Sequence, residues 1–467
     1  MPTDLRLDPG EIPLLNDLYE FTVAAAFFDR GMNEPASFDV GVRKLHANRG
    51  YMIAAGIERV IEALEEYRFD ERALEHLESR RLFKPEFLEY LRGFRFTGTV
   101  RAMPEGSLYF GGEPVAEVRA PLIEAQIVEP LFLNQLGIAS ITATKAARCH
   151  SVAMGRRLVE FGLRRAQGAD AGLVASRSSY LAGFHGTSNV LAGLRYGVPV
   201  FGTMSHSFIM AHESEGGAFE DFARSFPKLS TMLVDTYDSI RGVHNVVQLA
   251  DRLSKDGIEI LGIRLDSGDL LDLSRNARRI LDKARLNKVS IFASGNLDEY
   301  KVADLLKAGA PIDAFGIGTA LTVSDDAPSA DFTYKLSEYA GRGRLKTSAG
   351  KVTMPGRKQV FRVVDASLHC CGDFVGLIDE SPVALSREIK PTPAQIVPML
   401  EVVFENGGRI MPRPTLDQSR ERFFQNFSLL DSKRLALRNP EPYPVKPTAA
   451  LNAMIISEKL RTEKMQG

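Results

Sequence analysis

The 467-residue sequence has little cysteine and almost no net charge, and each shortage excludes a class of protein. Its three cysteines, including the adjacent Cys370 and Cys371, fit neither a disulfide framework nor a zinc-ligand spacing. We therefore expect structural thiols in a reducing cytoplasm. A formal net charge of −1 argues against broad binding to nucleic acid or to membranes through a polybasic segment. It does not exclude a local basic pocket.

Long hydrophobic runs are missing as well. No stretch of about 18 apolar residues is present, so we expect no transmembrane helix. The first residues, MPTDLRLDPGEIP, are acidic and lack an apolar segment, so we expect no signal peptide. Charged residues make up 25% and hydrophobic residues 44%, which is typical of a globular protein. The length favours two domains and allows a large core.

Short apolar runs alternate with helical patterns from Arg157 to about Leu321. This rhythm is typical of parallel βαβ units. The candidate strands are 158–163, a short one near 183–186, 198–203, 231–234, 259–265, 289–293 and 313–317. Seven strands are enough to close a parallel barrel.

The two ends of the chain show a different pattern. Glycines separate short alternating runs between residues 96 and 121, and alternation returns at 353–378, which indicates antiparallel strands. The simplest interpretation is a central barrel, with both chain ends forming a second domain that contains strands.

Three local signals predict where helices begin or break. Asn16 can cap a helix at 15–28, and Asn296 with Glu299 forms a capping-box pattern. Pro130 should break a long helical region near Glu129.

Polar side chains follow each candidate barrel strand, and ligands of parallel α/β folds bind at the carboxyl ends of the strands. They are Arg164 and Arg165; Thr187, Ser188 and Asn189; Thr203, Ser205, His206 and Ser207; Asp235 and Asp238; Arg264, Asp266, Ser267 and Asp269; Ser294, Gly295 and Asn296; and Gly316, Gly318 and Thr319. Arginine suits bidentate binding of phosphate or carboxylate, and aspartate suits magnesium. The backbone N–H groups of a tight glycine loop can bind phosphate. The set implies an anionic, phosphorylated substrate presented with magnesium.

Each of these groups also has a structural interpretation. Any one of the four aspartates could simply cap a helix, and the glycines at 316 and 318 could form an ordinary turn. Arg164 and Arg165 could be a solvated pair. For His206 a structural and a catalytic role are equally compatible with the sequence. The near-neutral pKa of histidine would let His206 act as a base or accept a phosphoryl group.

At these residues the chain resembles the nicotinate phosphoribosyltransferase family. The resemblance runs from LLNDLYEFTVAAAFF near the start to PYPVKPTAAL near the end. Between them, in the family's order, stand FGLRRAQGADAG, GFHGTSNVLAG, GTMSHSF, LVDTYDS, IRLDSGDL, IGTALTV and MPGRKQVFR. Seven motifs in one order make coincidence implausible.

The resemblance implies a reaction and a fold. Nicotinate and phosphoribosyl pyrophosphate would give nicotinate mononucleotide and pyrophosphate, coupled to ATP hydrolysis, in NAD biosynthesis. The enzyme would be a glycosyltransferase with ligase character. The fold implied is α/β: an irregular parallel (β/α) barrel at 122–349, with a flanking α/β sandwich domain built from both chain ends, 1–121 and 350–467. A cytoplasmic homodimer with shared active sites is expected, in which the helix of Tyr19 comes from the partner chain.

The resemblance also implies roles for individual residues. His206 is expected to carry a transient phosphohistidine, with Arg264 and Asp266 beside it as catalytic residues. Tyr19, Thr203 and Arg264 are expected to bind nicotinate, with Arg264 facing the carboxylate. Thr319, Gly318, Arg164, Arg165 and Ser188 are expected to bind phosphoribosyl pyrophosphate or to line the base pocket. Mg²⁺ is expected at Asp266 and Asp269, and ATP is the co-substrate.

Other interpretations stay open. The nicotinamide-using relative carries an aspartate where this chain has Ser188, and a serine leaves room for a carboxylate without a like-charge clash. Quinolinate phosphoribosyltransferase is shorter and lacks the GTMSHSF motif. An unrelated phosphosugar aldolase or isomerase would show a lysine or glutamate base at a strand end. A non-catalytic binding relative would have lost the arginine, histidine or aspartate set, which is complete here.

Overall fold

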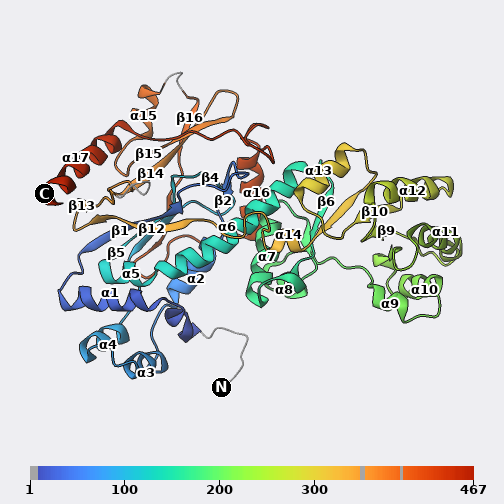
Figure 1. The fold of residues 1–467 in the computed structure, drawn as a ribbon, viewed down its shortest axis with the longest axis horizontal. Helices are drawn as coiled ribbons and strands as arrows, with labels where there is room; N and C mark the ends of the chain where they lie inside the picture. The colour runs from blue at the N-terminus through green and yellow to red at the C-terminus, as the bar shows by residue number, and fades with distance from the viewer. Residues whose placement is uncertain (1–8, 348–352, 390–392, 467) are drawn as a thin grey trace. The chain divides into compact units, whose positions relative to one another are not determined.

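The computed structural model describes residues 9–347, 353–389 and 393–466, which fold into two compact units (Figure 1). The first unit combines Met1–Ile141 with Ser329–Gly467, and the second is Thr142–Pro328. We had expected a barrel domain at 122–349, so the observed division differs at both boundaries. The segments 122–141 and 329–347 make their contacts with the first unit.

The first unit is built on a seven-stranded sheet in which β1 (Pro35–Val42) pairs antiparallel with β12 (Phe332–Tyr339) and with β5 (Pro114–Pro121). Beyond β5 follow β3 (Thr99–Ala102), β17 (Glu401–Glu405) and β18 (Gly408–Arg409), and β13 (Arg342–Gly343) lies outside β12. Strands from both ends of the chain therefore share one sheet.

A four-stranded sheet and a short two-stranded one complete the strands of this unit. Their members, in sheet order, are β16 (Gln395–Pro398), β14 (Lys358–Val364), β15 (Cys370–Leu377) and β19 (Val445–Pro447), and then β2 (Met52–Ile53) with β4 (Leu108–Tyr109). The helices are η1 (Pro9–Leu14), α1 (Leu18–Asp29), α2 (Ile57–Glu65), α3 (Glu71–Ser79), α4 (Pro85–Arg92), α5 (Leu122–Ile127), α15 (Pro382–Glu388), α16 (Leu416–Phe427) and α17 (Ala449–Gln466). The antiparallel strands predicted at 96–121 and 353–378 are confirmed by β3, β4, β5, β14 and β15.

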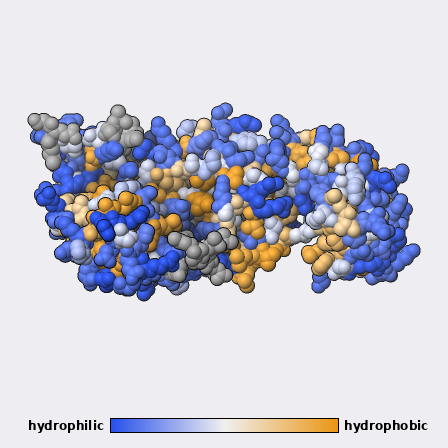
Figure 2. Space-filling view, turned by 60° about the horizontal axis from the view of Figure 1, so that its bottom comes forward, coloured by the Kyte–Doolittle hydropathy of each residue, from blue (hydrophilic) through white to orange (hydrophobic). Residues whose placement is uncertain are grey.

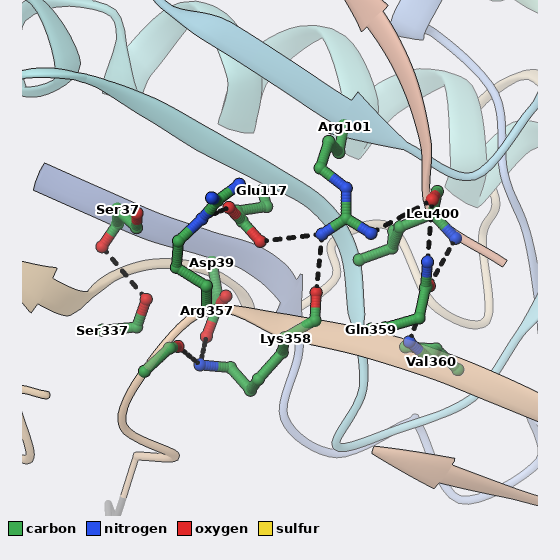
Figure 3. Close-up of polar contacts among 11 residues, drawn as sticks. Ser37, Asp39, Arg101, Glu117, Ser337, Arg357, Lys358, Gln359, Val360 and Leu400 are labelled. Atoms are coloured by element: carbon green, nitrogen blue, oxygen red, sulfur yellow. Dashed lines mark hydrogen bonds and ion pairs between the residues drawn. The ribbon is translucent and has the colours of Figure 1, made fainter. Parts of the chain in front are cut away.

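Charged side chains lie buried where the sheets of the first unit meet (Figure 3). Lys358 on β14 is fully buried, and its Nζ lies 2.7 Å from Oδ2 of Asp39 on β1. The guanidinium of Arg101 donates to Oε2 of Glu117 at 3.1 Å and to the backbone carbonyls of Lys358 and Leu400. These contacts join β1, β3, β5 and β14, and they replace part of the hydration that the charges lose on burial.

Helix starts follow local chemistry, although not always at the expected residue. The break at Pro130 is confirmed, because α5 ends at Ile127 and α6 (Glu129–Val152) begins one residue before the proline. The prediction that Asn16 caps the first helix is wrong. Asp17 occupies the N-cap position, and the Asn16 amide donates to the carbonyl of Ile127 at 2.7 Å.

The second unit is built on a parallel six-stranded sheet (green to orange in Figure 1). In sheet order its strands are β7 (Gly186–Thr187), β6 (Arg157–Glu160), β11 (Ala314–Ile317), β10 (Ser290–Ala293), β9 (Gly262–Leu265) and β8 (Thr231–Leu233). The helical segments are η2 (Leu163–Arg165), α7 (Ala169–Leu181), α8 (Val190–Tyr196), α9 (His206–Met210), α10 (Glu215–Ser225), η3 (Pro227–Leu229), α11 (Ser239–Lys255), α12 (Leu270–Lys283), α13 (Glu299–Lys307) and α14 (Thr319–Thr322). All the parallel strands end at the same edge of the sheet, which gathers the polar residues that follow them.

The closed barrel predicted from the sequence is not formed, because the described residues give an open sheet with β7 and β8 at its edges. The run at 198–203 contributes only an isolated parallel bridge between Val200 and Thr187. Pro199 lacks an N–H group and offers its carbonyl alone, which accepts from Thr187 at 3.0 Å. The run therefore adds too few ladder bonds to carry the sheet round to β8.

The helices of the second unit bury apolar faces that the sequence pattern indicates. On α11, for example, Val243, Val246, Leu249 and Leu253 are all buried. The capping box predicted at Asn296 is wrong, because Asp298 caps α13 and accepts from the Lys301 N–H at 2.8 Å. Of the helices described, none combines the length and the apolar character needed to cross a membrane.

Candidate active site

A cavity of about 290 Å³ opens at the carboxyl ends of the strands in the second unit. It is lined by Phe161, Arg164, Ser188, Gly202, Thr203, Met204, Ser205, His206, Leu233, Arg264 and Asp266. Most of these residues come directly after β6, β7 and the 198–203 run, or stand at the ends of β8 and β9. The fold therefore brings together six of the residues to which the sequence assigned a role: Arg164, Ser188, Thr203, His206, Arg264 and Asp266.

Arg264 on β9 is held by three hydrogen bonds. Its Nε donates to Ser294 Oγ at 2.8 Å, and its two terminal nitrogens donate to Thr203 Oγ1 at 3.0 Å and to Asp266 Oδ1 at 2.6 Å. The guanidinium carbon also lies 5.4 Å from the centre of the Phe161 ring. A guanidinium has five N–H donors, so hydrogens remain for a bound carboxylate or phosphate.

Asp266, two residues beyond Arg264, is held in the ionised form. Burial would raise the pKa of its carboxyl group, but the hydrogen bond from Ser294 and the charge of Arg264 outweigh burial and keep that pKa below its usual value. The backbone N–H of Asp266 donates to Oδ2 of Asp235 at 3.0 Å. The other oxygen of Asp235, Oδ1, is buried and has no hydrogen-bond partner. A buried carboxylate oxygen without a hydrogen-bond donor is suited to bind a cation.

His206 begins α9 and presents its ring to Asp266. Its Nδ1 lies 3.1 Å from Thr236 Oγ1, and its Nε2 lies 3.8 Å from Asp266 Oδ2. The His206 side chain is 43% exposed. The hydroxyl of Thr236 fixes the orientation of the ring, so Nε2 is accessible from the cavity and can act as a nucleophile or a base.

The glycine loop after β11 lies beside this cavity. Gly318 and Thr319 begin α14, and a Cβ atom at Gly318 would come within 3.0 Å of the Phe161 carbonyl. At Gly316 a Cβ would meet the Phe161 ring at 2.7 Å. The loop therefore packs directly on the turn that carries Phe161, although its residues do not line the cavity itself.

A second glycine contact joins two other loops. Gly295 follows β10 with a φ of +91°, and a Cβ there would lie 1.7 Å from the carbonyl oxygen of Asp266. Only a residue without a side chain fits this position, because both the backbone conformation and the space exclude one. The loops after β9 and β10 are thereby locked against each other.

Asp269 has the structural role that the sequence left open. It caps α12, where its Oδ1 accepts from the N–H groups of Leu271 at 3.0 Å and Asp272 at 3.1 Å. Asp238 caps α11 in the same way. Asp269 nevertheless lines a neighbouring cavity of about 760 Å³ that shares Asp266 with the first.

Two other predicted site residues lie outside both cavities. Arg165 is exposed on η2 and is not among the lining residues. Tyr19 belongs to the first unit, on α1, where it is half exposed. Burial and the neighbouring Glu20 and Glu129 raise the pKa of the Tyr19 phenol, which therefore stays protonated.

Sequence reasoning gave no role to several residues that shape the site. Phe161 supplies an aromatic wall, Thr236 orients His206, and Ser294 bonds both Arg264 and Asp266. The signal for Phe161 was present, because it is an aromatic residue directly after a buried strand and before a glycine. The sequence marks Asp235 and Ser294 only as residues that follow a strand.

Comparison with known proteins identifies the family. Profiles of nicotinate phosphoribosyltransferase match the chain in three parts: the N-terminal domain at 14–136, the family domain at 156–361 and the C-terminal domain at 357–455. The chain is 46% identical to nicotinate phosphoribosyltransferase pncB2 of Mycobacterium tuberculosis over 450 residues, 96% of this chain and 93% of that protein. The chain belongs to the nicotinate phosphoribosyltransferase family. The resemblance inferred from the motifs is thereby confirmed.

Other members of the nicotinate phosphoribosyltransferase family agree over similar lengths. The Bacillus subtilis nicotinate phosphoribosyltransferase is 36% identical, with 97% of this chain and 95% of that protein aligned. The crystal structure of human nicotinic acid phosphoribosyltransferase superposes with a TM-score of 0.83 at 31% identity, covering 94% of this chain and 99% of that chain. The α/β fold with its parallel sheet is thus that of the family.

Proposed function

We propose that this chain catalyses the reaction of nicotinate, phosphoribosyl pyrophosphate, ATP and water to nicotinate mononucleotide, pyrophosphate, ADP and phosphate, as a step of NAD biosynthesis. The observation that carries the proposal is Arg264, which stands beside the Phe161 ring in a cavity of about 290 Å³. A small aromatic acid matches both features, because its carboxylate pairs with the guanidinium and its ring packs on the phenyl group.

The rest of the cavity favours an acid over an amide. The Thr203 hydroxyl, 3.0 Å from Arg264, lies where it can share the carboxylate. Ser188 lines the cavity and adds no negative charge, whereas an aspartate there would repel nicotinate. Met204 and Leu233 give the remaining wall an apolar surface. In this proposal Tyr19 of the partner chain completes the nicotinate site.

Phosphoribosyl pyrophosphate would bind along the neighbouring strand ends. Arg164 and Arg165 supply charge for its phosphates, and the turn of Gly318 and Thr319 supplies backbone N–H groups. In this arrangement the anomeric carbon faces the pyridine nitrogen of nicotinate. The nitrogen lone pair forms the new bond to that carbon while the bond to pyrophosphate breaks, through an oxocarbenium-like transition state.

Among the described residues no group of three or more His, Cys, Asp or Glu side chains is arranged to hold a metal ion, so magnesium would take few protein ligands and keep several waters. Asp266 and Asp269 would hold it in this proposal, and Asp235 is a further candidate, because its Oδ1 is buried without a partner. One oxygen of Asp269 is already engaged in capping α12, which favours Asp235 over Asp269 as a direct ligand. When bound, magnesium neutralises charge on the pyrophosphate that leaves.

His206 is the proposed acceptor of a phosphoryl group from ATP. Its Nε2 attacks the γ-phosphorus, ADP leaves with the electrons of the broken bond, and water later hydrolyses the phosphohistidine. The phosphoryl group brings up to about two negative charges next to Asp266 and Asp235. We infer that this repulsion rearranges the strand-end loops and couples ATP hydrolysis to tight substrate binding.

We further propose a cytoplasmic homodimer. Val190, Leu191 and Leu194 form an exposed apolar face on α8, where Figure 2 shows hydrophobic residues gathered at the surface. An exposed apolar face of this kind suits a contact with a second copy of the chain. All three cysteines are free, as in a reducing compartment.

The decisive test offers the purified protein magnesium and phosphoribosyl pyrophosphate with nicotinate or nicotinamide, with and without ATP. Mononucleotide formed from nicotinate, increased by ATP and lost in His206→Ala, is the expected result. Product from nicotinamide alone would overturn the role given to Ser188 and favour the nicotinamide-using alternative. No product from either base, with retained ligand binding, would instead identify a non-catalytic relative.

A further inference from the structure

Glu160 is a buried carboxylate to which nothing above assigns a role. It is the last residue of β6 and the only charged residue in the apolar run 158–163. It is 0% exposed, and no cation of the described chain lies within ion-pair distance of it. Burial raises the pKa of this carboxyl group, against the effect of its hydrogen bonds. A carboxylate placed so deeply without a cation needs hydrogen-bond donors to offset the lost hydration.

The donors come from several loops of the proposed site. Oε1 accepts from the backbone N–H of Gly162, and the hydroxyl of Thr322 lies 3.5 Å away. Oε2 accepts from Thr187 Oγ1 at 2.5 Å and from Ser176 Oγ at 3.1 Å. One side chain therefore contacts the turn after β6, the end of β7, the helix α14 and the helix α7.

Three of the four contacted segments carry a residue of the proposed site. Gly162 follows Phe161, Thr187 precedes Ser188, and α14 begins with Thr319. The backbone carbonyl of Glu160 also accepts from the Ser188 N–H at 2.9 Å. Glu160 thus lies between the turns proposed to bind the base and the turn proposed to bind the phosphoribosyl group.

The turn after β6 and the helix α14 touch each other directly at Gly162 and Thr322. A Cβ atom at Gly162 would lie 1.6 Å from the Thr322 hydroxyl, so the turn after β6 and α14 touch with no room for a side chain between them. Oε1 of Glu160 lies against this close contact, 3.0 Å from the same Cβ position and 3.5 Å from the Thr322 hydroxyl.

Only one hydrogen bond around Glu160 has a fixed direction. The Gly162 backbone N–H can only donate, so Oε1 must accept. The hydroxyls can adapt, because Thr187 Oγ1 lies 3.1 Å from Ser176 Oγ, and Ser176 Oγ lies 2.9 Å from the Gly172 carbonyl. A glutamine could keep the Gly162 bond and donate its NH₂ group to Thr187, whereas an alanine would lose all of these contacts.

We propose that Glu160 is a positioning residue that keeps the base-side turns and the phosphate-side turn in register. This inference rests on the proposed function, because the register matters only if nicotinate and the phosphoribosyl group bind on either side of Glu160. A displacement of about 1 Å between two reactants can lower a rate on the order of 100-fold. The alignment controlled by Glu160 affects the bond-forming step, and thus kcat, more than the affinity for either substrate.

Glu160 should affect only one of the two half-reactions, nucleotide formation, and not the phosphorylation of His206. His206 stands on a different segment, and its ring contacts Thr236 and Asp266, neither of which touches Glu160. Phosphorylation of His206 by ATP should therefore survive a change at Glu160, whereas nucleotide formation should not. A residue that merely stabilises the fold would lower both together.

The test compares Glu160→Ala with the wild-type chain in two assays, and Glu160→Gln, which can keep the contacts with Gly162 and Thr187, is the conservative control. One measures the acid-labile phosphoprotein formed with γ-labelled ATP, and the other measures nicotinate mononucleotide at saturating substrates. We expect labelling to stay within about twofold of wild type and kcat to fall on the order of 100-fold. A kcat within twofold of wild type would overturn the proposal, as would an equal loss in both assays by a folded variant.

A matched pair on α7 keeps the test informative if Glu160→Ala does not fold. Ser176→Ala removes a hydroxyl that lies 3.1 Å from Glu160 Oε2 and 2.9 Å from the Gly172 carbonyl. Ser179→Ala removes an equally buried hydroxyl that bonds only a backbone carbonyl, that of Ser176, at 3.1 Å. We expect Ser176→Ala alone to lower kcat, by about tenfold, the effect of one lost hydrogen bond to a charged group. Equal kcat values for the two variants would contradict the role proposed for Glu160. If the wild-type chain forms no nicotinate mononucleotide, the result instead counts against the proposed function.

Discussion

Two aspartate–cation pairs of nearly the same length lie in the two units of this molecule, and they behave in opposite ways. In the first unit Asp39 lies 2.7 Å from Lys358, inside the junction of the sheets (Figure 3). In the second, Asp266 lies 2.6 Å from Arg264 at the strand ends. Burial raises the pKa of Asp39 to about 6, because Lys358 offsets only part of its effect. The pKa of Asp266 is instead held below its usual value.

The number of partners explains the difference. Oδ1 of Asp39 is buried without a hydrogen-bond partner, so Lys358 alone must compensate the lost hydration. Asp266 receives the guanidinium of Arg264 and the hydroxyl of Ser294, and it keeps contact with water. The distance between the two charges of an ion pair therefore does not tell whether the pair supports the fold or a functional site. The number of hydrogen-bond donors around the carboxylate and its access to solvent distinguish the two cases.

Removing Lys358 should give the largest effect and should be seen only in stability. Lys358→Met leaves Asp39 as an unpaired buried charge, which costs about 3–5 kcal/mol of unfolding free energy. Chemical denaturation measures the loss. The double variant Asp39→Asn/Lys358→Met should recover much of it, and a double-mutant cycle without coupling would contradict this account of the pair.

Removing Arg264 should affect function instead. Arg264→Ala takes away the partner of the nicotinate carboxylate, and loss of a buried charged partner costs about 2–5 kcal/mol, or roughly 30- to 5,000-fold in kcat/KM for nicotinate. Steady-state rates check this. The KM for phosphoribosyl pyrophosphate is the internal control, and an equal rise in both KM values would argue against carboxylate recognition.

The raised pKa of Asp39 predicts a specific dependence of stability on pH. Its pKa is about 6 in the folded chain, against 3.8 for an ordinary aspartate, so the folded state binds the proton more tightly. The stabilisation is present below about pH 4 and is lost as the pH rises through about 6, by at most about 3 kcal/mol. Unfolding free energies at pH 4, 5 and 6 should fall in the wild-type chain and change less in Asp39→Asn. If the unfolding free energies of the wild-type chain and of Asp39→Asn change equally with pH, the raised pKa does not belong to Asp39.

The lowered pKa of Asp266 should give the smallest effect. Ser294→Ala removes one hydrogen bond, worth about 1 kcal/mol, from the ionised form of Asp266, so its pKa should rise by less than one unit. The acidic limb of the kcat/KM profile should then move to higher pH. Ser290→Ala is the control, because Ser290 lies at the other end of β10 and bonds the Leu261 carbonyl. Identical profiles for the two variants would contradict the role of Ser294.

Periodicity and local chemistry predicted much of the fold. Six of the seven candidate strands of the second unit contain or overlap a strand of the parallel sheet, and the Pro130 break is where the proline requires it. The exception, 198–203, is apolar enough for a strand. Its Pro199 lacks the donor that a longer ladder needs, and whether the next strand lies near enough to pair depends on the whole sheet. Closure is a non-local property that no window of the sequence contains.

The candidate site was predictable in its residue types but not in its partners. Strand ends pointed to His206, Arg264 and Asp266, which the structure places around one cavity. The same signal could not tell that Asp269 caps a helix while Asp235 keeps a buried oxygen free. Both follow a strand and precede a helix. Only the three-dimensional course of the loops determines which carboxylate points inward.

The contact of Gly295 with the Asp266 carbonyl has a consequence for how this protein can change over generations. A substitution at position 295 would add atoms where the neighbouring loop already stands, and no compensating change at Asp266 could help, because the obstacle is backbone. The loops after β9 and β10 must therefore diversify together or not at all. Insertions that broaden substrate range should be found in other loops, and these two should keep their lengths in any lineage that retains the activity.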